Sequence, residues 1–171
     1  MPLRIAAKLP RAERGYFKER LEPLIDGDQI QIVGEVNERS KQKFLAEASA
    51  LLFPIDWPEP FGLVMIEAMA CGTPVIAFRR GSVPEIIEDG VTGFIVEDQE
   101  EALKAIKRLP ELDRRRVREG FERRFAARRM AEDYIRCYRF MLGRSLAPTS
   151  PQVREGGLSL STLPAAMKSL D

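Results

Sequence analysis

The chain has no histidine, only two cysteines, and a formal net charge of +1 over 171 residues. Without histidine it lacks the commonest general base. Cys71 and Cys137 are too few for a disulfide framework or a zinc site, so we expect two small buried residues in a reducing cytosol and no metal. A charge so near zero argues against nucleic-acid binding. No apolar run approaches the length of a membrane span and residues 1–8 lack a signal-peptide core, which favours a cytoplasmic protein.

Short apolar runs alternate with helical patterns, and this alternation predicts an α/β fold built on a doubly wound parallel sheet. The expected strands are residues 3–7, 30–33, 50–53, 75–78 and 94–96. The expected helices are residues 14–21, 40–48 (capped by Ser40), a helix following Gly62, and 83–87. After Gln99 the pattern is helical, with segments to 109, then 112–125 and 128–142. We therefore predict one domain over residues 1–142 and a disordered tail over 143–171.

The predicted carboxy-terminal helices carry two kinds of side chain. The last one has an apolar stripe at helical spacing, which predicts a buried face; its members are Met130, Tyr134, Cys137, Tyr138 and Met141. Acidic residues alternate with the arginines at 114–116 and 123–124. We therefore expect those arginines to form a solvated helix face rather than a nucleic-acid site.

The most informative segment is residues 58–77, PEPFGLVMIEAMACGTPVIA, where two carboxylates stand eight positions apart. Glu59 precedes an apolar helix and Glu67 lies inside it. A lone buried carboxylate is costly, so a polar ligand would explain Glu67. The alternatives are that Glu67 pairs with an arginine and that Glu59 is an ordinary loop carboxylate.

The placement of this segment predicts what it binds. Open α/β sheets bind ligands at the carboxyl ends of their strands. Gly62 allows close backbone approach, and the free N–H groups of a helix start suit a diphosphate. Glu67 lies roughly 7 Å further along the helix axis, with Glu59 on the opposite side of the helix start. One carboxylate can then reach a ribose and the other a sugar across the phosphates.

The segment resembles the donor-binding signature of retaining GT-B glycosyltransferases of the group 1 (family 4) type. The resemblance rests on the Glu-x7-Glu spacing and on residues 72–77, 81–87 and 89–96, and it covers about the first 140 residues. It implies transfer of a sugar from a nucleotide diphosphate-sugar to a hydroxyl acceptor with retention, with no cofactor besides the donor. It assigns Glu67 to the ribose and Glu59, the implied catalytic residue, to the sugar. The other implied donor-binding residues are Gly34, Glu35 and Val36, beside the base, and Phe61, Gly62 and Leu63, beside phosphate and sugar.

Compared with the pattern of that family, this chain is expected to differ in two respects. The family places a Gly-Arg strand and a lysine ahead of the strand at residues 3–7, and it has an acceptor-binding amino-terminal half. We expect this chain to lack both. The acceptor (a glycan, a lipid or a small molecule) would then be bound by a missing domain or a partner chain, which would also make any peripheral membrane contact.

Three other readings stay open. The chain could be a nucleotide-sugar binding module or a fragment that is inactive without a partner. It could be a fragment of a nucleotide-binding oxidoreductase, although no Gly-x-Gly-x-x-Gly follows the first strand. It could also serve only in protein interaction, through an apolar face left by the absent half.

Overall fold

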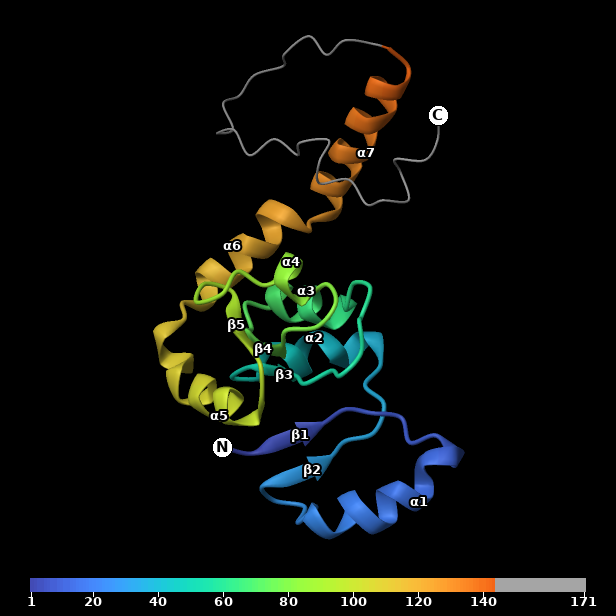
Figure 1. Cartoon of the computed structure of the whole chain (residues 1–171), viewed down its shortest axis with the longest axis vertical. Coiled ribbons are helices and arrows are strands. Elements are labelled where there is room, and N and C mark those ends of the chain that lie inside the picture. The colour runs from blue at the N-terminus through green and yellow to red at the C-terminus, as the bar shows by residue number, and fades with distance from the viewer. Residues whose placement is uncertain (144–171) are drawn as a thin grey trace. The chain divides into compact units, whose positions relative to one another are not determined.

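A computed structural model describes residues 1–143, and the predicted disordered tail falls outside the described residues except for Gly143. The chain divides into a first unit, Met1–Glu132, and a second that begins at Asp133. Figure 1 shows the α/β character of the first unit, in which every strand pairing is parallel. The predicted fold class is therefore confirmed. In the described residues, no helix is long and apolar enough to cross a membrane.

The parallel strands form two sheets rather than one. The smaller sheet joins β1 (Leu3–Ile5) to β2 (Ile30–Ile32), with Leu3 opposite Ile30. The larger has the order β3-β4-β5, from β3 (Leu51–Phe53), β4 (Val75–Phe78) and β5 (Gly93–Val96). No ladder joins the two sheets within residues 1–143.

The helices follow the predicted order closely. Between β1 and β2 the chain forms η1 (Arg11–Glu13), α1 (Arg14–Tyr16), η2 (Phe17–Leu21) and η3 (Glu22–Leu24). The central helices are α2 (Glu38–Ala46), α3 (Leu63–Ala70) and α4 (Val83–Ile86). They are followed by α5 (Gln99–Arg108), η4 (Leu109–Glu111), α6 (Arg114–Arg124) and α7 (Ala127–Met141). The predicted cap of α2 was wrong: Asn37 is the N-cap, and its side chain accepts from the Ser40 N–H.

The core lies on both faces of the larger sheet. On one face Val75 and Ala77 of β4 pack with Met65 and Met69 of α3 and with Val117 of α6, all at most 1% exposed. On the other face a second cluster joins the sheet to α5; its buried members are Ile76, Phe94, Val96 and Ala105. Burial on both faces explains why the strand segments are apolar at consecutive positions.

The sequence predicted that the arginines of α6 form a solvated helix face. Several of them instead make hydrogen bonds or ion pairs with other segments of the first unit. The Arg114 guanidinium donates to the carbonyls of Ala46 and Ala48 and to Thr73 Oγ1, at 2.7–2.8 Å. Arg123 and Arg124 both pair with Glu88. These contacts attach α6 to the loops at the edge of the core.

The predicted buried stripe of α7 was also wrong. Met130, Tyr134, Tyr138 and Met141 are each more than half exposed, and α7 contains no buried residue. Cys137 is exposed and Cys71 is half-buried, so neither is the fully buried thiol that the sequence predicted. Helical spacing of apolar residues describes an amphipathic face, but it does not say whether anything covers that face.

Candidate functional site

The turn before α3 holds the Glu59 carboxylate in a defined place. Gly62, at φ 71°, is the N-cap of α3, and a Cβ there would come within 2.6 Å of Met65 Cε. Its N–H donates to Glu59 Oε1 at 3.1 Å. Trp57 Nε1 donates to Glu59 Oε2 at 3.0 Å. Both oxygens of this half-buried carboxylate are therefore oriented at the helix start.

The first turn of α3 offers backbone donors beside that carboxylate. Four N–H groups at a helix start lack intrahelical partners, and one of the nearest, on Gly62, already binds Glu59. Within residues 1–143 the N–H groups of Leu63 and Val64 have no acceptor outside the helix. Leu63 is 64% exposed and Phe61 is 41% exposed, so this end of the helix is open to solvent. The sequence predicted that Gly62 and Leu63 would both face a ligand, whereas in this structure the Gly62 N–H is occupied.

The loop after β4 supports the Glu59 segment through hydrogen bonds and close backbone packing. The Ser82 N–H donates to the Glu59 carbonyl at 3.0 Å, and Ser82 Oγ donates to the Phe61 carbonyl at 2.9 Å. Gly81, at φ 49°, lies so close to the backbone of Pro58 and Glu59 that an added Cβ would overlap it. The loops after β3 and β4 thus meet at the carboxyl edge of the sheet and fix each other.

Glu67 lies on the second turn of α3 and faces α2. Lys41 Nζ donates to Glu67 Oε1 at 2.7 Å and to Glu38 Oε1 at 2.8 Å. Hydrogen bonds and charge from Glu38 and then Glu67 raise the pKa of Lys41 above its ordinary value. Glu67 is only half-buried, and Oε2 accepts no hydrogen bond within the described residues. The predicted alternative of an internal ion pair is therefore realised, with a lysine in place of an arginine.

The predicted base-binding loop belongs to the smaller sheet. Gly34, Glu35 and Val36 follow β2, and Glu35 lies 3.8 Å from Lys8, which follows β1. Both side chains are well exposed. In the described residues no hydrogen bond or ion pair joins this loop to Glu59 or Glu67. The structure therefore brings Glu59, Phe61, Gly62, Leu63 and Glu67 onto one loop and helix, and leaves residues 34–36 on the other sheet.

Three cations that follow β1 and β4 along the chain are paired with acids. Arg79 Nε lies 2.5 Å from Glu97, and Arg80 Nε lies 3.5 Å from Asp56. Lys8 pairs with Glu35. Each of these three cations therefore has its own carboxylate.

Sequence reasoning missed two of the residues that shape the site. Lys41 is 26 positions from Glu67, and its only local signal is the helical i, i+3 spacing from Glu38. Ser82 gave a weak signal, as a short polar residue between a strand and a helix. Each side chain contacts residues more than 20 positions away in the sequence, and a local pattern does not reveal such contacts.

Residues 11–123, more than half of the chain, match the family described as glycosyl transferases group 1. N-acetyl-alpha-D-glucosaminyl L-malate synthase of Bacillus anthracis is 36% identical over 119 residues, which is 65% of this chain and 30% of that protein. Sulfoquinovosyl transferase of Arabidopsis thaliana is 34% identical over 137 residues, 74% of this chain and 26% of that protein.

Among solved structures, Anabaena HepE in complex with UDP superposes with a TM-score of 0.69 at 23% identity. The superposition covers 81% of this chain and 40% of HepE, and it supports the fold. The chain spans less than a third of the length of the curated relatives that it matches. The extent of the family match decides the classification: the chain belongs to the group 1 glycosyl transferases.

Proposed function

We propose that this chain forms the donor-binding half of a sugar transferase. In the reaction, the bond between the anomeric carbon of a sugar and the diphosphate of its nucleotide carrier breaks. A bond from that carbon to a hydroxyl oxygen of the acceptor forms, with the anomeric configuration retained. The observation that carries the proposal is the joining of Glu59, the open start of α3 and Glu67 on one loop and helix. A relative named as a sulfoquinovosyl transferase, and a structural neighbour solved with UDP-glucose, support it.

The start of α3 is the proposed diphosphate site. Within residues 1–143 the N–H groups of Leu63 and Val64 have no acceptor outside the helix, and the positive end of the helix dipole favours an anion there. Glu59 is negative, so it suits hydroxyl groups of the sugar rather than phosphate oxygens. Each charge-assisted hydrogen bond of this kind contributes about 1.5–3 kcal/mol.

Glu67 is the proposed ribose ligand. Its Oε1 is held by Lys41, so Oε2 is the oxygen open to a ribose hydroxyl. Lys41 holds the carboxylate in place while a neutral hydroxyl donates to the other oxygen. Gly34, Glu35 and Val36 remain the proposed contacts of the base, on the loop after β2.

Titration calorimetry with nucleosides and their diphosphates tests this proposal. The chain should bind the diphosphate of uridine, guanosine or adenosine more tightly than the matching nucleoside, because the start of α3 contributes only when phosphates are present. Equal binding of nucleoside and diphosphate, or no binding with any of the three bases, would contradict the proposal.

A second candidate function is that this chain binds the nucleotide sugar but, by itself, does not transfer the sugar. The observation that favours it is the pairing of Arg79, Arg80 and Lys8 with carboxylates, which leaves no unpaired cation among them for a departing diphosphate. Loss of one group that stabilises developing charge typically costs about 10²–10³ in rate. The residues that position the acceptor would lie in another domain or chain. Binding without detectable transfer would identify this second function.

A further inference from the structure

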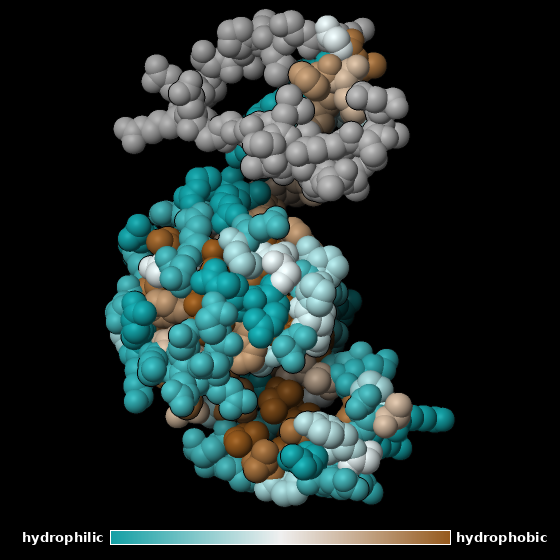
Figure 2. Space-filling view, in the orientation of Figure 1, coloured by the Kyte–Doolittle hydropathy of each residue, from teal (hydrophilic) through white to brown (hydrophobic). Residues whose placement is uncertain are grey.

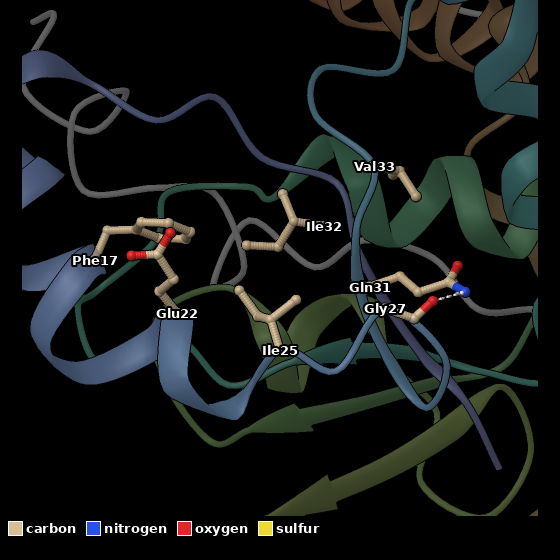
Figure 3. Close-up of a pocket in the computed structure, with 7 residues that line it drawn as sticks. All are labelled: Phe17, Glu22, Ile25, Gly27, Gln31, Ile32 and Val33. Carbon is tan, nitrogen blue, oxygen red and sulfur yellow. Dashed lines mark hydrogen bonds between the residues drawn. The ribbon is translucent and has the colours of Figure 1, made fainter.

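The first unit has an open hollow beside β2, and its lining is poorly suited to hold a sugar. Figure 2 shows hydrophobic side chains gathered over β1 and β2. Figure 3 shows the hollow, of about 540 Å³, where apolar side chains such as Ile25 and Ile32 face one another. Its polar side chains are Glu22 and Gln31, and Gln31 already donates to a backbone carbonyl at 2.9 Å. The more polar candidate contact for a sugar is the turn that carries Glu59.

A tight turn joins Trp57 to Glu59 in two ways. The Glu59 N–H donates to the Trp57 carbonyl at 2.9 Å, which closes a three-residue turn with Pro58 at its centre. The proline ring fixes the φ angle of this central residue. The indole Nε1 of Trp57 donates to Glu59 Oε2 at 3.0 Å. The same two residues are therefore connected through the backbone and through the side chains.

The other polar groups of Glu59 are held as well. Its carbonyl accepts from the Ser82 N–H at 3.0 Å, and Oε1 accepts from the Gly62 N–H at 3.1 Å. A carboxylate has about four lone-pair sites for hydrogen bonds, shared by its oxygens. Within residues 1–143 each oxygen of Glu59 has one protein donor, so each keeps a lone pair for a ligand hydroxyl. The two protein donors fix the direction in which these open positions point.

Trp57 contributes little to the core of the domain. The residue is 57% exposed and belongs to neither of the two core clusters. Among the residues that the structure describes, it takes part in no aromatic or cation–π pair. In the same part of the chain, its only side-chain hydrogen bond is the one to Glu59. The specific contact of this indole is therefore polar, and it is made with the proposed sugar ligand.

We propose that Trp57 is a positioning residue, which acts through Glu59 to strengthen binding of the sugar part of the donor. This inference rests on the proposed function, in which Glu59 binds sugar hydroxyls. A free glutamate side chain would have to be ordered when the ligand binds, and that ordering costs conformational entropy. The N–H groups of Trp57 and Gly62 order it beforehand. A ligand without the sugar does not use Glu59, so Trp57 favours the nucleotide sugar over the bare diphosphate.

The first test is the NMR signal of the indole N–H in the chain without ligand. The chain has a single tryptophan, so the signal is assigned to Trp57 directly. A hydrogen bond to a carboxylate is stronger than one to a neutral amide. The signal should therefore move in Glu59→Gln and stay in place in Glu119→Gln, on the exposed surface of α6. An indole signal that is the same in the unaltered chain and in Glu59→Gln would overturn the proposal.

The second test is calorimetry of Trp57→Phe, which keeps an aromatic ring and removes the N–H donor. The ligands are the nucleoside diphosphate of the base that binds best and its glucose or mannose conjugate, whichever binds more tightly. The affinity for the sugar-bearing ligand should fall roughly two- to tenfold, the range for one hydrogen bond. The affinity for the diphosphate should not change. Tyr16→Phe, which removes a hydroxyl from a residue that is 59% exposed, is the control and should change neither.

The outcomes separate this inference from the proposed function. If Glu59→Gln weakens only the sugar-bearing ligand and Trp57→Phe weakens neither, the sugar contact stands and the role of Trp57 is refuted. If Trp57→Phe weakens both ligands equally, its role is structural, and the proposal is overturned. If the chain binds both ligands and neither substitution changes either affinity, Glu59 does not bind the sugar. The sugar contact of the proposed function then fails together with this inference.

Discussion

Replacing Glu67 with glutamine should weaken the binding of nucleoside diphosphates and nucleotide sugars by the same factor. The ribose is common to both ligands, and Glu67 is the proposed ribose contact. The substitution removes one negative charge and keeps the size of the side chain. It therefore changes the strength of hydrogen bonds at one position without opening a cavity.

The structure sets the size of the effect. Glu67 Oε1 is engaged by Lys41 at 2.7 Å, which leaves Oε2 for the ligand. A hydrogen bond to a charged group contributes about 1.5–3 kcal/mol, and 1.4 kcal/mol is a factor of ten in Kd. Glutamine still offers an amide oxygen, so the lower end of the range applies, and we expect a loss of at least about tenfold. The fold should be little affected, because Lys41 retains its hydrogen bond to Glu38.

Calorimetric titration with UDP and UDP-glucose, or the equivalent ligands of the preferred base, measures the effect. Glu59→Gln is the matched comparison and should weaken only the sugar-bearing ligand. Glu119→Gln, on the exposed surface of α6, is the control and should change neither. The reasoning is refuted if Glu67→Gln and Glu59→Gln reduce the affinity of both ligands equally, or if Glu67→Gln leaves both unchanged while the protein remains folded.

Two further outcomes can be checked by unfolding measurements. Gly81→Ala should lower the free energy of unfolding by at least about 1 kcal/mol more than Gly90→Ala. Both glycines have positive φ, but only at Gly81 would a Cβ overlap the Glu59 backbone; equal losses in urea denaturation would contradict this contact. The stabilisation by Lys41 should be present at neutral pH and disappear as the pH rises through its raised pKa, because a raised folded pKa stabilises the fold only while the lysine is protonated. The difference in stability between the unaltered chain and Lys41→Met should accordingly shrink above about pH 10.4, and a difference that grows there would contradict the ion pair.

Local patterns were sufficient for the elements and for the membership in the family. Apolar runs bounded by glycine and proline predicted all five strands within one or two residues, because hydrophobic periodicity and turn residues act over a few positions. Gly62 and Pro60 predicted the break before α3 for the same reason. The family also follows from the linear string of residues around Glu59 and Glu67, which needs no coordinates.

Contacts between segments that are distant in the sequence could not be predicted from local patterns. The partner of Glu67, the support of Glu59 by Ser82, and the bonds of Arg114 at the end of α2 join residues 23 to 68 positions apart. Whether the apolar stripe of α7 is covered, and whether five parallel strands form one sheet or two, depends on which surfaces meet in space. Periodicity places a side chain on a face of its own helix or strand, but tertiary packing determines what that face contacts.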